Sequence, residues 1–213
     1  WNRRQVGQRL VLVRPGLAGE KAAQIGLGHL RAKRAVVRAR AGDRFGRPLA
    51  LEPSVGEGAL AVALIKVAVG QVALTACDTD EVALKVAEPA IVAAYKAEGV
   101  KSPTCQIHTH DFLLVSAHDS VRYDFIVMNP PFTGGADMAH VMHAWKLLAD
   151  GGTIVALTSP AWKTANTKAA IAFRDFVGIH STAVEDIPKG TFEHTNIATV
   201  MLVLRKPALP SSN

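Results

Sequence analysis

The stretch RYDFIVMNPPF, residues 122–132, decides the fold. Its apolar part has the length and composition of a buried β-strand. The strand must stop at Asn129, because a proline cannot donate to a sheet and disfavours helical conformation in the residue before it. The turn therefore holds Asn129, Pro130 and Phe132 in a rigid rim beyond the carboxyl end of a strand. In open α/β sheets, ligands bind beyond the carboxyl ends of the strands.

A second turn from strand to helix is predicted upstream, where the apolar residues 49–51 are followed by EPSVGEG, residues 52–58. Small residues allow this turn to be tight and to approach a ligand closely, although Ser54 stands where a dinucleotide-binding loop has its first glycine. The next predicted strand, 71–77, ends at Asp78. Asp78 lies 20 residues after Gly58, about the separation at which such folds place a carboxylate on ribose hydroxyls. Asp80 is the alternative for that role.

The rest of the chain alternates between helical and strand-like patterns. Helices are predicted at 81–99, 138–148 and 169–177, and strands at 104–108, 153–158, 184–187 and 198–204. We expect Pro89 to kink the first helix, Met142 to face the core, and Asp150, Gly151 and Gly152 to end the second helix. This order predicts an α/β fold with a mostly parallel central sheet, one antiparallel strand near the C-terminus, and helices on both faces.

Together these motifs resemble the amino-methyltransferase branch of the class I S-adenosylmethionine (SAM)-dependent methyltransferases, which carry an (Asn/Asp/Ser)-Pro-Pro-(Tyr/Phe/Trp) tetrapeptide. The resemblance covers roughly residues 49–206 and is greatest to adenine-specific (N6) DNA methyltransferases. It implies a Rossmann-like fold, SAM as methyl donor, and transfer to the exocyclic amine of adenine in DNA. The N-terminal motif of the family is not recognisable in residues 1–47.

The resemblance also implies roles for individual residues. The catalytic residues would be Asn129, Pro130, Pro131 and Phe132. The cofactor-binding residues would be Glu52, Pro53, Ser54, Gly56, Glu57, Gly58, Asp78, Thr79, Asp111, Phe112 and Asn129. The substrate-binding residues would be Phe132, Trp162 and Phe192. SAM suits the first turn better than a dinucleotide does, because Glu52 and Glu57 would repel a pyrophosphate but attract the methionine ammonium.

Several substrates remain open at this point. The same tetrapeptide occurs in enzymes that methylate adenine or guanine amines in RNA and the side-chain amide of glutamine (N5) in proteins, and all of these substrates present a planar, conjugated amine. Methylation at carbon 5 of cytosine is disfavoured, because Cys77 and Cys105 do not follow proline as the nucleophile of those enzymes does. An alternative of another class is a noncatalytic subunit of a heteromer that binds SAM or nucleic acid.

Positive charge is concentrated at the N-terminus. Residues 1–47 contain twelve Lys and Arg against two acids, although the net charge of the 213 residues is only +6. We therefore expect a basic, partly helical N-terminal extension at 1–47, with a strand at 9–13 and a helix at 20–40, followed by a catalytic domain at 48–206 and a tail at 207–213. A basic segment favours a nucleic-acid partner, and the resemblance implies DNA over RNA. Since no target-recognition domain follows residue 206, a protein partner that supplies recognition is a further expectation.

Other classes of protein are disfavoured by composition. No apolar run reaches the roughly 18 residues of a membrane-spanning helix, and two cysteines cannot build a disulfide framework. His108, His110, His140 and His143 lack the spacing of a metal site, so no metal is expected. These observations predict a cytoplasmic protein. Because the first residue is Trp1, we expect that the native start is missing.

Overall fold

The computed structural model describes residue 43 and residues 46–116, 121–189 and 198–209. The strands are β1 Leu49–Glu52, β2 Ala73–Asp78, β3 Cys105–Thr109, β4 Tyr123–Met128, β5 Leu148–Thr158, β6 Ser181–Ile187 and β7 Thr199–Arg205. The helices are α2 Ala59–Val67, α3 Glu81–Ala97, α4 Ala136–Leu147 and α5 Lys168–His180, with 3-10 turns η1 Phe112–Leu114, η2 Thr133–Gly135 and η3 Pro160–Lys163. The predicted strand at 9–13, the predicted helix at 20–40 and Phe192 lie outside the described residues.

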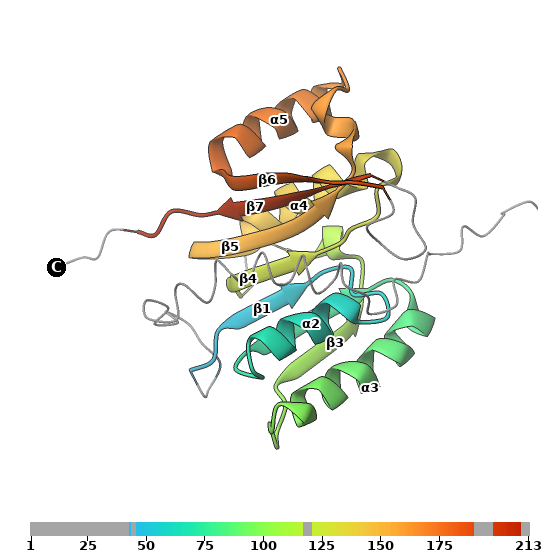
Figure 1. The fold of residues 1–213 in the computed structure, drawn as a ribbon, viewed down its shortest axis with the longest axis vertical. Helices are drawn as coiled ribbons and strands as arrows, with labels where there is room; N and C mark the ends of the chain where they lie inside the picture. Colours follow the sequence, from blue (N-terminus) through green and yellow to red (C-terminus); the bar gives the residue numbers. More distant parts are fainter. Residues whose placement is uncertain (1–42, 44–45, 117–120, 190–197, 210–213) are drawn as a thin grey trace, which may run out of the picture.

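The strands of the described chain form a seven-stranded sheet in the order β3-β2-β1-β4-β5-β7-β6 (Figure 1). All neighbours pair in parallel except β7, which is antiparallel to both β5 and β6. This arrangement confirms the predicted Rossmann-like α/β fold. The chain fills the sheet outward from β1 to β3 and then, in the other direction, from β4 to β5. The strand order therefore switches between β1 and β4, which is the place where such sheets bind ligands.

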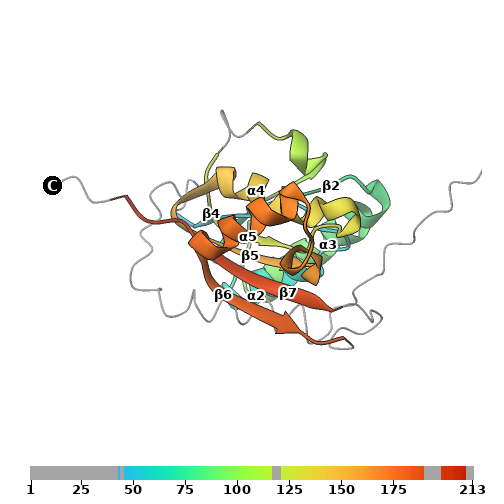
Figure 2. The ribbon, with the colours of Figure 1, turned by 90° about the horizontal axis from the view of Figure 1, so that it is seen from above.

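The two faces of the sheet bury separate cores, because successive side chains of a strand point to opposite faces. Along β4, Val127 packs with the residues of α2 and α3, while Ile126 and Met128 pack with those of α4 and α5. Figure 1 shows α2 and α3 on one face of the sheet, and Figure 2 shows α4 and α5 together over the other. Strand β4 is thus covered on both faces, and its end is fixed in space.

Two predicted details of the α4 region are wrong. The glycines at 151 and 152 do not end a helix, since Leu148 is already extended and Gly151 N–H donates to the carbonyl oxygens of Lys206 and Pro207. Strand β5 therefore begins before the glycines and includes them. Met142 is 37% exposed, because the buried face of α4 is formed by Val141, Ala144 and Leu147.

Pro89 lies inside α3, which continues from Glu81 to Ala97 across it. The proline is on the exposed side of the helix, where water can satisfy the carbonyl group that loses its helical partner. No helix of the described residues is long and apolar enough to cross a membrane.

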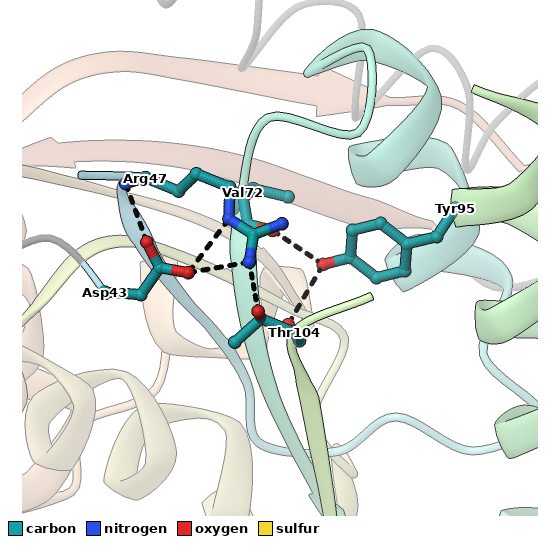
Figure 3. Close-up of polar contacts among 5 residues, drawn as sticks. All are labelled: Asp43, Arg47, Val72, Tyr95 and Thr104. Carbon is teal, nitrogen blue, oxygen red and sulfur yellow. Dashed lines mark hydrogen bonds and ion pairs between the residues drawn. The ribbon is translucent and has the colours of Figure 1, made fainter. Parts of the chain in front are cut away.

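The chain enters the sheet at the amino ends of the strands, opposite the carboxyl ends where the site is predicted. The Arg47 guanidinium pairs with Asp43 (2.7 Å) and donates to the Thr104 hydroxyl, just before β1 and β3 begin. Tyr95 of α3 donates to the carbonyl oxygen of Val72 (2.8 Å) beside it (Figure 3). Arg47 is one of the twelve basic residues of the N-terminal segment. Its positive charge is paired with Asp43 inside the protein.

Candidate functional site

The Asn-Pro-Pro-Phe turn lies at the carboxyl end of β4, directly beside the switch in strand order. Pro130 is buried, whereas Asn129 and Pro131 are exposed and Phe132 is half-buried. The buried Pro130 and the fully buried Met128 before Asn129 hold the backbone in place. The Asn129 amide is thus left facing outward on a rigid support, with the Pro130 carbonyl next to it in the chain.

The turn after β1 is held against the end of β2. Val55 N–H donates to the Cys77 carbonyl oxygen (3.1 Å), and Gly56 N–H donates to Oδ2 of Asp78 (2.8 Å). Gly58 has a left-handed φ of 88°, and a Cβ atom there would lie 3.2 Å from Ala87 of α3. Glycine is therefore required at position 58 both by the backbone and by the closeness of α3.

Asp78 and Asp80 have different structural tasks. Oδ1 of Asp80 caps α3 by accepting from Val82 N–H (2.9 Å) and Ala83 N–H (3.2 Å). Asp78 uses Oδ2 to hold the Gly56 turn and Oδ1 to accept from Asp80 N–H (3.1 Å), and it stays half-exposed. Since a carboxylate has about four lone-pair sites, Asp78 retains acceptor capacity toward a ligand. Thr79, between them, is exposed.

Glu52 is a buried carboxyl group at the end of β1. Its side chain is 1% exposed and Oε2 has no hydrogen-bond partner among the described residues. Burial, and secondarily the Asp78 charge, raise the pKa of Glu52 well above its ordinary value, while a hydrogen bond with the Ala61 backbone opposes this. An unpaired carboxyl group of this kind favours a cationic partner, which would offset its desolvation.

Three carboxyl groups converge around Cys77. Burial raises the pKa of the Cys77 thiol to about 12, and the charges of Asp78, Asp111 and Glu52 add to the effect. The ends of β1, β2 and β3 thus form one electronegative region. At neutral pH Cys77 is a thiol, and it lies 3.7 Å from the Pro53 carbonyl oxygen; it is therefore a poor nucleophile.

Asp111 and Phe112 follow β3. Asp111 is exposed and its Oδ1 caps η1 by accepting from Leu113 N–H (2.9 Å). The Phe112 ring is 2% exposed and packs edge-on against His143, with 4.8 Å between the ring centroids. Any contact of Phe112 with a cofactor is therefore restricted to its backbone.

Trp162 lies in the core and not on the surface of the site. It is 5% exposed, its Nε1 donates to the Thr158 hydroxyl (3.1 Å), and its ring packs against Phe173. A ring in this position cannot stack on a substrate without leaving the core. In the ligand-free structure Trp162 anchors the segment after β5.

Asp137 was missed by the sequence prediction. It is fully buried in the first turn of α4, and its Oδ2 accepts from Ser159 N–H (2.8 Å) at the end of β5. The bond joins the helix that follows the Asn-Pro-Pro-Phe turn to the neighbouring strand. An acid in the first turn of a helix is usually a surface charge that interacts with the helix dipole, so its position alone gave no reason to expect burial.

Of the two histidines of α4, His140 makes an ordinary structural hydrogen bond, whereas Nε2 of His143 is buried without a hydrogen-bond partner among the described residues. Nδ1 of His140 donates to the Ala136 carbonyl oxygen (2.7 Å), and burial lowers the pKa of His143. Across the described ranges, no three His, Cys, Asp or Glu side chains are grouped so that they could hold a metal ion.

Residues 49–180 match the family model of the methyltransferase small domain. A comparison with curated proteins found no match. Among solved structures, the chain is similar to a type I restriction-modification system methyltransferase subunit from Streptococcus thermophilus (16% identity, 91% of this chain and 44% of that chain, TM-score 0.68). It is also similar to the type IIG restriction endonuclease BpuSI (18%, 95% and 26%, TM-score 0.67) and to TrmN from Thermus thermophilus (20%, 86% and 48%, TM-score 0.55). The chain spans less than half the length of each of these proteins.

Proposed function

Because the chain belongs to the methyltransferase small domain family, we propose that it transfers a methyl group from SAM to the N6 amine of adenine in DNA. The observation that carries this proposal is the exposed Asn129 amide, whose neighbours in the chain, Met128 and Pro130, are both buried. It lies at the switch in strand order, beside the electronegative ends of β1 to β3. The Asn129 amide, which can accept a hydrogen bond from the target amine, thus lies next to a region that suits a cationic ligand such as SAM.

The residues beyond β1, β2 and β3 fit SAM, which bears a sulfonium and an ammonium. Bound SAM supplies an electrophilic methyl group. Glu52, with its unpartnered Oε2, and Glu57 would hold the ammonium, while Asp78 would accept from the ribose hydroxyls. Asp111 would interact with the adenine end. The electronegative region disfavours a pyrophosphate for the same reason that it favours SAM.

Asn129 and Pro130 would orient the target amine. The adenine amine is a weak nucleophile, because its lone pair is delocalised into the ring, so it needs positioning more than deprotonation. Oδ1 of Asn129 and the Pro130 carbonyl oxygen would accept its two hydrogens and direct its lone pair toward the methyl group. These hydrogen bonds strengthen as positive charge develops on nitrogen, so they stabilise the transition state more than the ground state. The half-buried Phe132 ring would stack on the base.

DNA is proposed over RNA because the restriction-modification subunit and the endonuclease superpose with higher TM-scores than a structure described as a putative RNA methyltransferase. RNA is the second candidate, since a putative RNA methyltransferase from Pyrococcus horikoshii also shares the fold, with a TM-score of 0.55 and 15% identity. The restriction proteins are more than twice as long as this chain. Since the Streptococcus thermophilus protein is described as a subunit of a restriction-modification system, a protein partner that supplies target recognition is part of the proposal.

Methyl transfer from isotope-labelled SAM to duplex DNA, total RNA and a protein extract, assayed in parallel, tests the proposal. Label in N6-methyldeoxyadenosine is the expected result. Label in ribonucleosides or in methylglutamine would show that the substrate is RNA or protein, and the proposed transfer to an amine would stand. If SAM binds but no label is transferred, the catalytic proposal would have to give way to a noncatalytic subunit.

The roles of Asp78 and Asp80 can be distinguished by substituting each residue in turn. We expect Asp78→Ala to weaken SAM binding by about 10-fold or more, because a hydrogen bond to a charged group contributes about 1.5–3 kcal/mol. Asp80→Ala should instead lower the melting temperature through loss of the α3 cap, at a cost of about 1 kcal/mol, with little change in SAM affinity. Calorimetric titration and thermal melting of both variants check this. The opposite pattern would move the ribose contact to Asp80.

A further inference from the structure

The charged side chains at the carboxyl edge of the sheet are divided between its two halves. The loops after β1, β2 and β3, at 52–58, 78–80 and 110–116, contain five carboxylates and no lysine or arginine. Strand β6 runs parallel to β5, because each is antiparallel to β7. The segments that follow β5 and β6 at this edge carry Lys163, Lys168 and Lys189, and Lys163 is paired with Asp186 of β6. A cation and a polyanion would therefore be attracted to different halves.

The basic half contains a segment that is rich in hydrogen-bond donors. Residues 163–168, KTANTK, have a donor group on every side chain except Ala165, and they include no carboxylate. Thr164, Asn166, Thr167 and Lys168 are exposed. Lysine, threonine and asparagine side chains are among those that contact phosphates in protein–nucleic acid complexes. The composition and exposure of this segment thus suit a phosphate backbone.

Hydrogen bonds hold this segment in one conformation. Nη1 of Arg174 donates to the carbonyl oxygens of Trp162 (2.6 Å) and Ala165 (2.7 Å). The Thr167 hydroxyl caps α5 by accepting from Ala170 N–H (3.2 Å), and Nζ of Lys163 lies 2.5 Å from Oδ1 of Asp186. A segment that is already ordered loses little conformational entropy on binding.

Lys168 has a charge that helix stability does not explain. It is the first residue of α5, where the helix dipole disfavours a positive charge. The first turns of α3 and α4 carry the favourable acids Glu81 and Asp137, whereas those of α2 and α5 have no acid. A nearby anion would attract Lys168 and so offset this unfavourable interaction.

We propose that residues 163–168 bind the phosphate backbone of the nucleic-acid substrate, an inference that rests on the proposed function. Strand β5 is the direct neighbour of β4, with Met128 opposite Ala156. The segment therefore follows the strand that lies next to the one ending at Asn129. The backbone would lie over the β5 and β6 ends, while the acidic ends of β1 to β3 are left to the cationic cofactor. The target base would then reach the Asn-Pro-Pro-Phe turn from the basic side.

The test is equilibrium binding of the full chain to duplex DNA at several salt concentrations. We expect Lys168→Gln to make the slope of log affinity against log salt shallower by about 0.9. Lys163→Gln/Lys168→Gln should make it shallower by less than twice that, because Lys163 is already paired with Asp186. SAM affinity should not change. Lys85→Gln/Lys96→Gln is the matched control, because it removes the same charge from exposed positions on α3; its slope should equal that of the wild type. Lys168→Gln leaves the Lys163–Asp186 pair intact, which separates loss of charge from loss of fold.

Two results would overturn the inference in distinguishable ways. If the wild type binds and methylates nucleic acid but the lysine variants keep its salt slope, residues 163–168 are not the phosphate contact and the proposed function stands. If the wild type neither binds nor methylates DNA or RNA, the proposed function fails, and this inference fails with it. Transfer to RNA with the same loss of slope in the variants would support the surface and change only the substrate.

Discussion

Asn129→Ala should lower kcat about 100- to 1,000-fold while the protein stays folded and binds SAM almost as the wild type does. Removal of one preorganised hydrogen-bonding group from a transition-state site typically has an effect of this size. The Asn129 side chain is exposed, so its truncation leaves no cavity, and the flanking Met128 and Pro130 remain buried. Single-turnover methylation and calorimetric SAM titration measure the two quantities separately.

Gln106→Ala is the matched control for this variant. Gln106 is an exposed carboxamide within β3, away from the carboxyl end of its strand, and its loss should leave kcat unchanged. If Asn129→Ala keeps wild-type turnover, the amine is not oriented by the turn and the assigned chemistry is wrong. If it loses SAM affinity and turnover in equal measure, Asn129 serves the cofactor and not the amine.

The parts of the fold that could be predicted from sequence are those specified by local constraints. The β4 turn was predictable, because two prolines end a strand wherever they occur. The turn after β1 was predictable because Gly58 tolerates a left-handed conformation, and the structure shows it at a φ of 88°. The boundary between α4 and β5 was not predictable in this way. Gly151 can end a helix or lie within a strand, and its hydrogen bonds to residues 206 and 207 decide between the two.

The burial of two side chains could not be predicted, for a different reason. Trp162 and Asp137 both stand where a local pattern gives a surface residue, one in a loop and the other in the first turn of a helix. Their burial depends on partners distant in sequence: Phe173 for Trp162, and Ser159 for Asp137. Such contacts exist only after the layers are packed. The separation of charge between the two halves of the site likewise follows from the strand order and cannot be derived from net charge.

The proposed role of Glu52 in cofactor binding would have a cost in stability. Its pKa in the folded protein lies above the 4.5 of an ordinary glutamate. Below pH 4.5 both the folded and the unfolded chains hold the proton. As the pH rises from 4.5 to the folded pKa, the unfolded chain loses the proton first, so the free energy of unfolding falls by about 1.4 kcal/mol for each pH unit between the two pKa values. Above the folded pKa, the loss is complete.

Glu52→Gln should therefore stabilise the ligand-free protein at neutral pH and weaken SAM binding about 10- to 150-fold. Glutamine keeps the size of a protonated glutamate and can accept from Ala61 N–H, but it neither ionises nor pairs with a cation; a charged hydrogen bond contributes about 1.5–3 kcal/mol. The difference in melting temperature between variant and wild type should shrink as the pH falls toward 4. Burial also raises the pKa of Asp124, but that contribution is common to both proteins and cancels in the difference.

Glu57→Gln provides the control for stability, because it makes the same chemical change at a half-exposed position of the same turn. We expect its melting temperature to follow that of the wild type across the pH range. Melting curves without SAM and calorimetric titrations with SAM give the two effects of Glu52→Gln independently. A Glu52→Gln protein that melts below the wild type at neutral pH would show that the carboxylate is already paired within the fold. Glu52 would then be a structural residue, and the cofactor's ammonium would need another partner, with Glu57 the remaining carboxylate in that turn.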